Sequence, residues 1–136
     1  MADLTISPAS VGVNVANPTI TVVQVGEAVT QGQPVYLKLS DQKYWKANAT
    51  NSDLANVYGI PLTAGAADDF VVLIRGGNMD LGATLTVGET YVVSSTSGGI
   101  APIGDLVSTN YVSILGIATA SDNLNLAINV SGIQKA

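Results

Sequence analysis

The chain has 136 residues, enough for one ordinary domain, and it contains no Cys and no His. Disulfides, thiolate metal sites and catalysis by cysteine or histidine are therefore excluded. Only 11% of the residues are charged, against about 25% in an average soluble domain, and the net charge is −5, which favours protein contacts over nucleic acid.

The first 18 residues, which end in ASVGVNVANP, have no counterpart later in the chain. They lack the basic start and apolar run of a signal peptide, and no segment of the chain approaches the roughly 18 apolar residues of a membrane span. We therefore expect a soluble, unprocessed chain with no membrane partner. Two interpretations of this segment stay open, a frayed terminus or an arm that adds as a strand to a neighbouring subunit. The second is suggested by alternating apolar residues, namely Leu4, Ile6, Val11, Val13 and Val15.

From Thr19 onward, apolar and polar residues alternate with a period of two, and no window has helical periodicity. Each alternating run is rich in Val, Ile, Thr or Tyr and is bounded by turn residues. Short strands at such spacing predict an all-β fold, a compact sandwich or barrel. The predicted strands are Thr19 to Val25, Pro34 to Leu39, Lys43 to Ala47, Asn56 to Leu62, Phe70 to Arg75, Thr90 to Ser94, Tyr111 to Thr119 and Leu124 to Val130.

Three sequence blocks occur twice, in the same order and at nearly constant spacing. They are GEAVTQGQPVY (26–36) with GATLTVGETYV (82–92), VYGIPLTA (57–64) with ILGIATAS (114–121), and DDFVVLI (68–74) with DNLNLAI (122–128). We interpret residues 19–136 as one β domain built by internal duplication, with repeats at about 19–75 and 76–132, and residues 1–18 as an extended arm. One repeat alone is too small to bury two sheet faces. The first repeated phrase is interpreted as a turn that supports the fold.

No set of residues predicts catalysis, a metal site or a cofactor. Asp68 and Asp69 are adjacent, so in a strand they would face opposite sides, and turn roles suit them better. Ser40 lies near two lysines but outside any S-x-x-K motif. The acidic and amide residues around Asp122 and Asp41 lack the loop pattern of a calcium site. The protein is therefore not expected to be an enzyme.

The stretch KYWK (43–46) is the best candidate recognition element, because aromatic rings beside lysines stack on sugars or bases. The duplication aligns Trp45 with Ile100, which suggests that Trp45 faces inward. Tyr44 and the two lysines are then left for the surface.

The runs GEAVTQGQPVYLKLSDQKYWKANA, VYGIPLTAGAADDFVVLIRGG, LGATLTVGETYVVSSTSGGIAPI and ILGIATASDNLNLAI resemble small bacteriophage capsid decoration, or cement, proteins of the DUF2190-like type. In that family a G-x-x-V-x-x-G-D-x-V-Y opening and a later G-I-A strand are typical. The resemblance covers Thr19 to Val130. Gln33 stands where an acidic residue is usual, Pro61 stands where a small residue is usual, and the first 18 residues lie outside the pattern.

The resemblance implies a structural protein of the virion that is made in the host cytoplasm. It would bind the outer capsid surface as a homotrimer and bridge major capsid proteins. Similar units occur in head-binding domains of tail fibres and spikes, and a carbohydrate-binding β module is a further alternative. The expected contact residues are those of the arm, Leu4, Ile6, Val11, Val13 and Val15, and secondarily Tyr44, Lys46 and Arg75.

Overall fold

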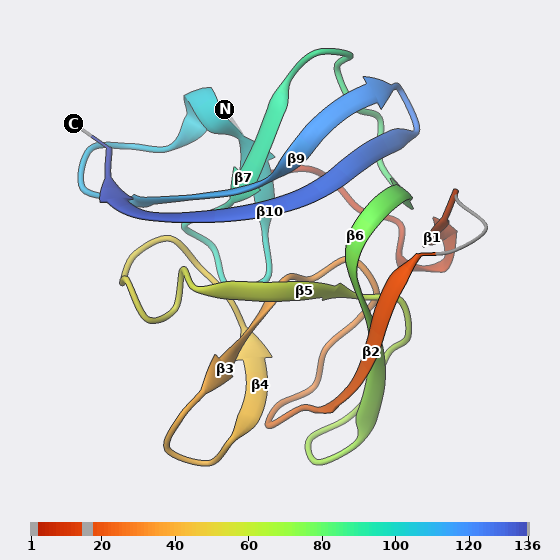
Figure 1. Ribbon diagram of the computed structural model, residues 1–136, viewed down its shortest axis with the longest axis vertical. Coiled ribbons are helices and arrows are strands. Elements are labelled where there is room, and N and C mark those ends of the chain that lie inside the picture. Colours follow the sequence, from red (N-terminus) through yellow and green to blue (C-terminus); the bar gives the residue numbers. More distant parts are fainter. Residues whose placement is uncertain (1–2, 15–17, 136) are drawn as a thin grey trace.

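The computed structural model describes residues 3–14 and 18–135, and these residues form an all-β structure (Figure 1). The predicted fold class is confirmed, because an antiparallel sheet curls into a half-barrel around the core. The strands are β1 (Val11–Val13), β2 (Thr19–Gln24), β3 (Val35–Lys38), β4 (Lys43–Lys46), β5 (Val57–Pro61), β6 (Phe70–Leu81), β7 (Thr90–Val93), β8 (Ile100–Pro102), β9 (Tyr111–Ala120) and β10 (Asn123–Gln134). Two short 3-10 turns, η1 (Pro8–Ser10) and η2 (Ile103–Asp105), complete the described elements.

The strand order of the sheet is mirrored about its centre. It runs β4-β3-β5-β6-β10-β9-β7-β8, so the strands of the first half take the same places relative to β6 as those of the second half take relative to β10. In Figure 1 the β3–β4 hairpin and the β9–β10 pair lie at opposite ends of the molecule. The two central strands pair with each other over Gly76–Met79 of β6.

Strand β6 continues beyond the predicted end at Arg75, through Gly76 and Gly77 to Leu81. The two glycines were expected to end the strand, but they pair with Ala127 and Leu126 of β10. The first part of β6 lies beside β2 and β5, and the second part lies beside β1 and β10. One long strand therefore joins the two halves of the sheet.

The described part of the N-terminal segment is bonded to the β domain and is not a frayed end. The N–H of Leu4 donates to the Ile100 carbonyl, and the N–H of Ser7 donates to the Gly82 carbonyl, both at 2.8 Å. Strand β1 then pairs with β6. The side chains of Leu4, Ile6 and Val11 are partly buried against the main core.

The core consists of one large cluster, a smaller one and a third of only three buried residues, Ala49, Val92 and Leu106. The large cluster lies between the two halves and includes Ile60, Ile74, Tyr91 and Leu115. The smaller cluster is made largely of valines from β2, β3, β6 and the turn after β2. An isolated parallel bridge between Val25 and Tyr44 of β4 places the end of β2 beside the β3–β4 hairpin. The end of β2 and this hairpin enclose the smaller cluster.

Candidate functional site

Trp45 of the KYWK strand is held inside its own hairpin. Its indole Nε1 donates to Oδ2 of Asp41 at 3.0 Å, and Nζ of Lys38 lies 4.3 Å from the ring centroid. A Cβ atom on Gly26 would overlap the ring, so that residue packs directly against it. The side chain is half-buried and packs against the main core. These contacts within the chain occupy the indole ring, so it is not free to stack on a sugar or a base.

Asp41 closes the turn of this hairpin through its carboxylate. The backbone N–H of Lys43 donates to Oδ1 at 2.9 Å and lowers the pKa of Asp41 below its ordinary value of 3.8. Burial opposes this effect, and the Trp45 indole adds to the lowering. The carboxylate is therefore ionised at neutral pH and links the turn to the ring.

Tyr44 and Arg75, predicted as separate contact residues, both contact Tyr58. The Tyr44 and Tyr58 ring centroids are 5.0 Å apart with an interplanar angle of 49°. The guanidinium of Arg75 lies 3.8 Å from the centroid of the Tyr58 ring, and its Nε donates to the Tyr58 carbonyl at 3.1 Å. Burial raises the pKa of Tyr44, so its phenol is neutral at physiological pH. Both tyrosines are partly buried, whereas Arg75 is exposed.

Lys46, the third predicted secondary contact, is directed to Glu27. Its Nζ lies 3.8 Å from Glu27 Oε1, and its backbone N–H donates to Oε2 at 3.0 Å. Lys43 similarly forms an ion pair with Asp68 at 2.6 Å. Within the part of the chain that the structure describes, Arg75 has no such acidic partner. The structure thus separates Arg75 from the two lysines of KYWK.

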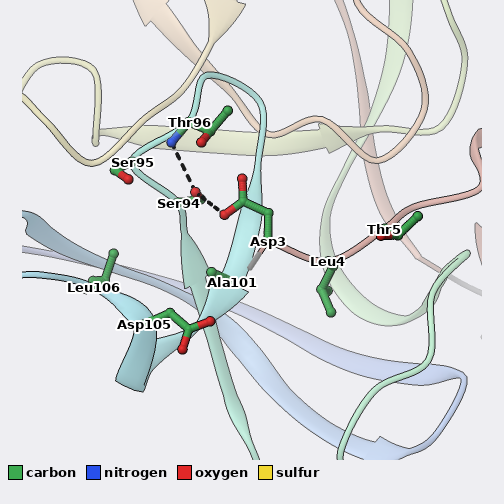
Figure 2. Close-up of a pocket in the computed structure, with 9 residues that line it drawn as sticks. All are labelled: Asp3, Leu4, Thr5, Ser94, Ser95, Thr96, Ala101, Asp105 and Leu106. Atoms are coloured by element: carbon green, nitrogen blue, oxygen red, sulfur yellow. Dashed lines mark hydrogen bonds between the residues drawn. The ribbon is translucent and has the colours of Figure 1, made fainter. Parts of the chain in front are cut away.

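The start of the arm lines a pocket of about 470 Å³ with the Ser94–Thr96 turn and η2 (Figure 2). Ser94 Oγ donates to Asp3 Oδ1 at 2.5 Å and accepts from the Thr96 N–H at 3.0 Å. In Figure 2 the Asp3 carboxylate turns toward Ser94, whereas that of Asp105 lies further down, on the Ala101 side. Oδ2 of Asp105 is buried and has no hydrogen-bond partner in the described structure. These contacts hold the arm in place.

A second hollow of about 510 Å³ lies between strand β3 and the loop that precedes β5. Its walls include Tyr36, Leu37 and Leu39 on one side and Asp53 and Leu54 on the other. Burial raises the pKa of Tyr36, and the charges of Glu27, Asp41 and Asp53 add to this. The hollow thus has several apolar walls, and its lining carries one acidic residue, Asp53, and one basic residue, Lys38.

Asp68 and Asp69, the adjacent aspartates considered above for catalysis, lie in the turn before β6. Asp68 adopts a positive φ of 72° in the turn before β6, and Asp69 Oδ2 accepts from the Ala66 N–H at 3.0 Å. Over residues 3–14 and 18–135, no three acidic side chains are grouped so that they could hold a metal ion. The described segments also include no helix long and apolar enough to cross a membrane.

Sequence reasoning missed the role of one surface residue and, apart from Val13, the positions of the exposed apolar side chains. Tyr58 received no role, although it joins Tyr44 to Arg75. Large hydrophobic side chains are also exposed at eleven described positions, and the adjacent valines of TITVVQ were a signal for one of them, Val22. These positions are Val13, Ile20, Val22, Leu37, Leu39, Phe70, Val87, Val107, Ile117, Val130 and Ile133.

No family model, no curated protein and no solved structure matches this chain.

Proposed function

We propose that this protein is a structural protein of a bacteriophage virion, which binds the outer surface of the head and stabilises it by bridging major capsid proteins. The observation that carries the proposal is the surface, where eleven large hydrophobic side chains are exposed among the described residues of a chain with only 11% charged residues. Exposed apolar side chains that lie together, as Ile20 and Val22 do on one face of β2, are typical of protein contact sites. Binding at several points would raise the avidity above that of each contact.

Arg75 is the predicted contact that this proposal favours most. It is exposed, fixed by stacking on Tyr58 and without an ion pair in the described structure. Arginine and tyrosine are among the residue types that are enriched at the energetic centres of protein interfaces. An acidic side chain of the capsid protein is its natural partner, because a guanidinium binds a carboxylate through two parallel hydrogen bonds.

The arm takes a different role in this proposal. Leu4, Ile6 and Val11 are packed on the chain's own core, whereas Val13 is 41% exposed. Val15, also predicted as a contact, lies outside the described residues. The arm would therefore support the contact surface, with Val13 as its exposed side chain.

The carbohydrate-binding alternative loses its aromatic platform, because Trp45 and Tyr44 are engaged by neighbouring residues. The hollow beside β3 is the remaining place for a sugar, with Asp53 and Asn56 as polar groups. The two functions are separated by one comparison. Purified protein is mixed with heads that lack a decoration protein, and in parallel with a glycan array.

We expect the protein to sediment with the heads and to bind no glycan. Arg75→Ala should weaken head binding at least tenfold, which corresponds to about 1.4 kcal/mol. Lys46→Ala is the matched control, since Lys46 is already paired with Glu27, and we expect head binding close to that of the wild type. Glycan binding without head association would overturn the proposal.

A further inference from the structure

Strand β2 has one edge bonded to β6 and one free edge. The N–H of Val25 donates to the β6 side, at the Asp69 carbonyl, whereas the N–H of Gly26 donates to β4 on the opposite side, each at 2.9 Å. Because backbone groups alternate along a strand, the even-numbered residues Ile20 and Val22 direct their N–H and C=O groups away from β6.

The residue opposite Val22 confirms this assignment. Val72 is the partner of Val22 in the β2–β6 register. Its N–H donates to Thr63 Oγ1 at 3.0 Å, and its carbonyl accepts from the Leu62 N–H at 2.7 Å, both on the side away from β2. This is the pattern of a non-hydrogen-bonded pair, in which both residues turn their backbone groups outward. Among the described residues no strand pairs with β2 on that outer edge between Thr19 and Val22.

The same two residues also expose their side chains. Ile20 is 53% exposed and Val22 is 62% exposed. Phe70, which is 67% exposed, lies opposite Gln24 in the register and thus on the same face of β2 and β6. An open backbone edge and an apolar strip coincide at one place, at the right of Figure 1 where β2 lies beside β6.

The two ends of the main sheet path are protected in ways that β2 is not. Strand β4 carries Lys43 and Lys46, and β8 has three residues and ends at Pro102. Charge, short length and proline are the usual means by which edge strands avoid pairing with other chains. From Pro18 to Gly26 the sequence PTITVVQVG has no charged residue, in a chain of net charge −5.

The described termini of the chain are used elsewhere and do not cover this edge. The arm donates to Ile100 and Gly82 and pairs with β6 through β1. At the other end, β10 pairs with β9, and Lys135 bonds to the Asn110 and Thr109 backbone. A strand added to β2 would therefore come from another molecule.

We propose that the free edge of β2 binds β2 of a second copy of this chain, antiparallel, about a twofold axis at Thr21. In this register Ile20 lies opposite Val22 of the second copy and Val22 opposite its Ile20. Both pairs have outward backbone groups, so each exchanges two N–H···O bonds. The exposed Ile20 and Val22 side chains of both copies then form one strip on a common face.

Three features favour a second copy as the partner. The edge is self-complementary about Thr21, as a twofold contact requires. It brings no like charges together, although the chain as a whole is acidic. Its length also fits, because Pro18 lacks an N–H on one side and the bridge from Val25 to β4 closes the edge on the other. The proposal does not depend on capsid binding, and it predicts a dimer, whereas the resemblance to decoration proteins implies a trimer.

Sedimentation velocity over a range of protein concentrations tests the contact. We expect a concentration-dependent dimer for the wild type, and at least a tenfold weaker association for Val22→Lys, which places charge on the edge. Val87→Lys is the matched control, because Val87 is 64% exposed but lies in the turn before β7, and its association should equal the wild type. A wild-type monomer at all concentrations, or any oligomer that Val22→Lys leaves unchanged, would overturn the proposal.

The register is tested with a single cysteine, because the chain has none of its own. Thr21 of the two copies would form a non-hydrogen-bonded pair with Cα atoms about 4.5 Å apart, within disulfide range. Thr21→Cys should therefore form a covalent dimer under mild oxidation with copper phenanthroline. In Thr19→Cys the two thiols would be roughly 13 Å apart along the strands and should cross-link at least tenfold more slowly. Equal rates for the two variants would overturn the register.

Discussion

The two copies of the repeated phrase form the same turn. Val29 in the first copy and Leu85 in the second are both buried, at 2% and 4% exposure. Gly32 and Gly88 have φ values of 88° and 85°, in the left-handed region that favours glycine. The matched positions thus have the same burial and the same backbone conformation in both copies. The repeated phrase therefore has a structural role.

The copies differ in what covers the first glycine of the phrase. Gly26 packs against the Trp45 ring from its own hairpin. Gly82 packs against the backbone of Ser7, from the arm that has no counterpart in the other copy. Two similar units therefore complete their cores by different means, one with a large side chain and the other with an added segment.

The largest expected effect concerns a feature that the copies share, a glycine that faces the backbone of the next strand. A Cβ on Gly116 would overlap the Asn125 carbonyl, and a Cβ on Gly59 would lie 2.9 Å from the Ile74 carbonyl oxygen. Because backbone cannot move aside as a side chain can, we expect Gly116→Ala to lower the free energy of unfolding by about 3 kcal/mol or more, and Gly59→Ala by about half as much. Urea unfolding followed by circular dichroism measures both. Gly116→Ala with wild-type stability would contradict the close approach.

Most of this framework was predictable from the sequence, because alternation and turn residues are local signals. The eight predicted strands are all present, each within a few residues of its expected bounds except at the extended ends of β6 and β10. Strand β8 was missed because its three residues are too few for a period-two pattern, and β1, in the segment interpreted as an arm, was not expected to pair with β6. The fold class is confirmed, whereas the capsid role and the partners stay predictions.

The contacts around the candidate site were less predictable, because they depend on long-range pairing. Tyr44 and Arg75 are 31 positions apart in the sequence, and the β3–β4, β3–β5 and β5–β6 pairings together bring both to Tyr58. Glu27 similarly reaches Lys46 only once β4 lies beside the end of β2. A single sequence gives no register for such pairs, so the ion pair that occupies Lys46 could not be anticipated.

The second-largest expected effect on stability concerns the first glycine of each repeated phrase, where the two copies differ. Gly82 has a φ of 69°, which strains any residue other than glycine, and it faces backbone, whereas Gly26 has no positive φ and faces the side chain of Trp45. We expect Gly82→Ala to cost about 2–3 kcal/mol and Gly26→Ala about 1 kcal/mol. The same urea titrations give both values. Equal costs would mean that the arm and the tryptophan fill their places in the same way.

The smallest effect reports on the contact between Asp41 and Trp45, which is particular to the first copy. Because the folded chain holds the Asp41 pKa below its ordinary 3.8, the ionised carboxylate stabilises the hairpin at neutral pH, and this stabilisation is lost as the pH falls below 3.8. Trp45 is the only tryptophan, so its fluorescence should change in that window. Asp41→Asn should remove the transition while the circular dichroism stays unchanged. A transition that persists in Asp41→Asn would assign it to another carboxylate and leave the Trp45 ring independent of the turn.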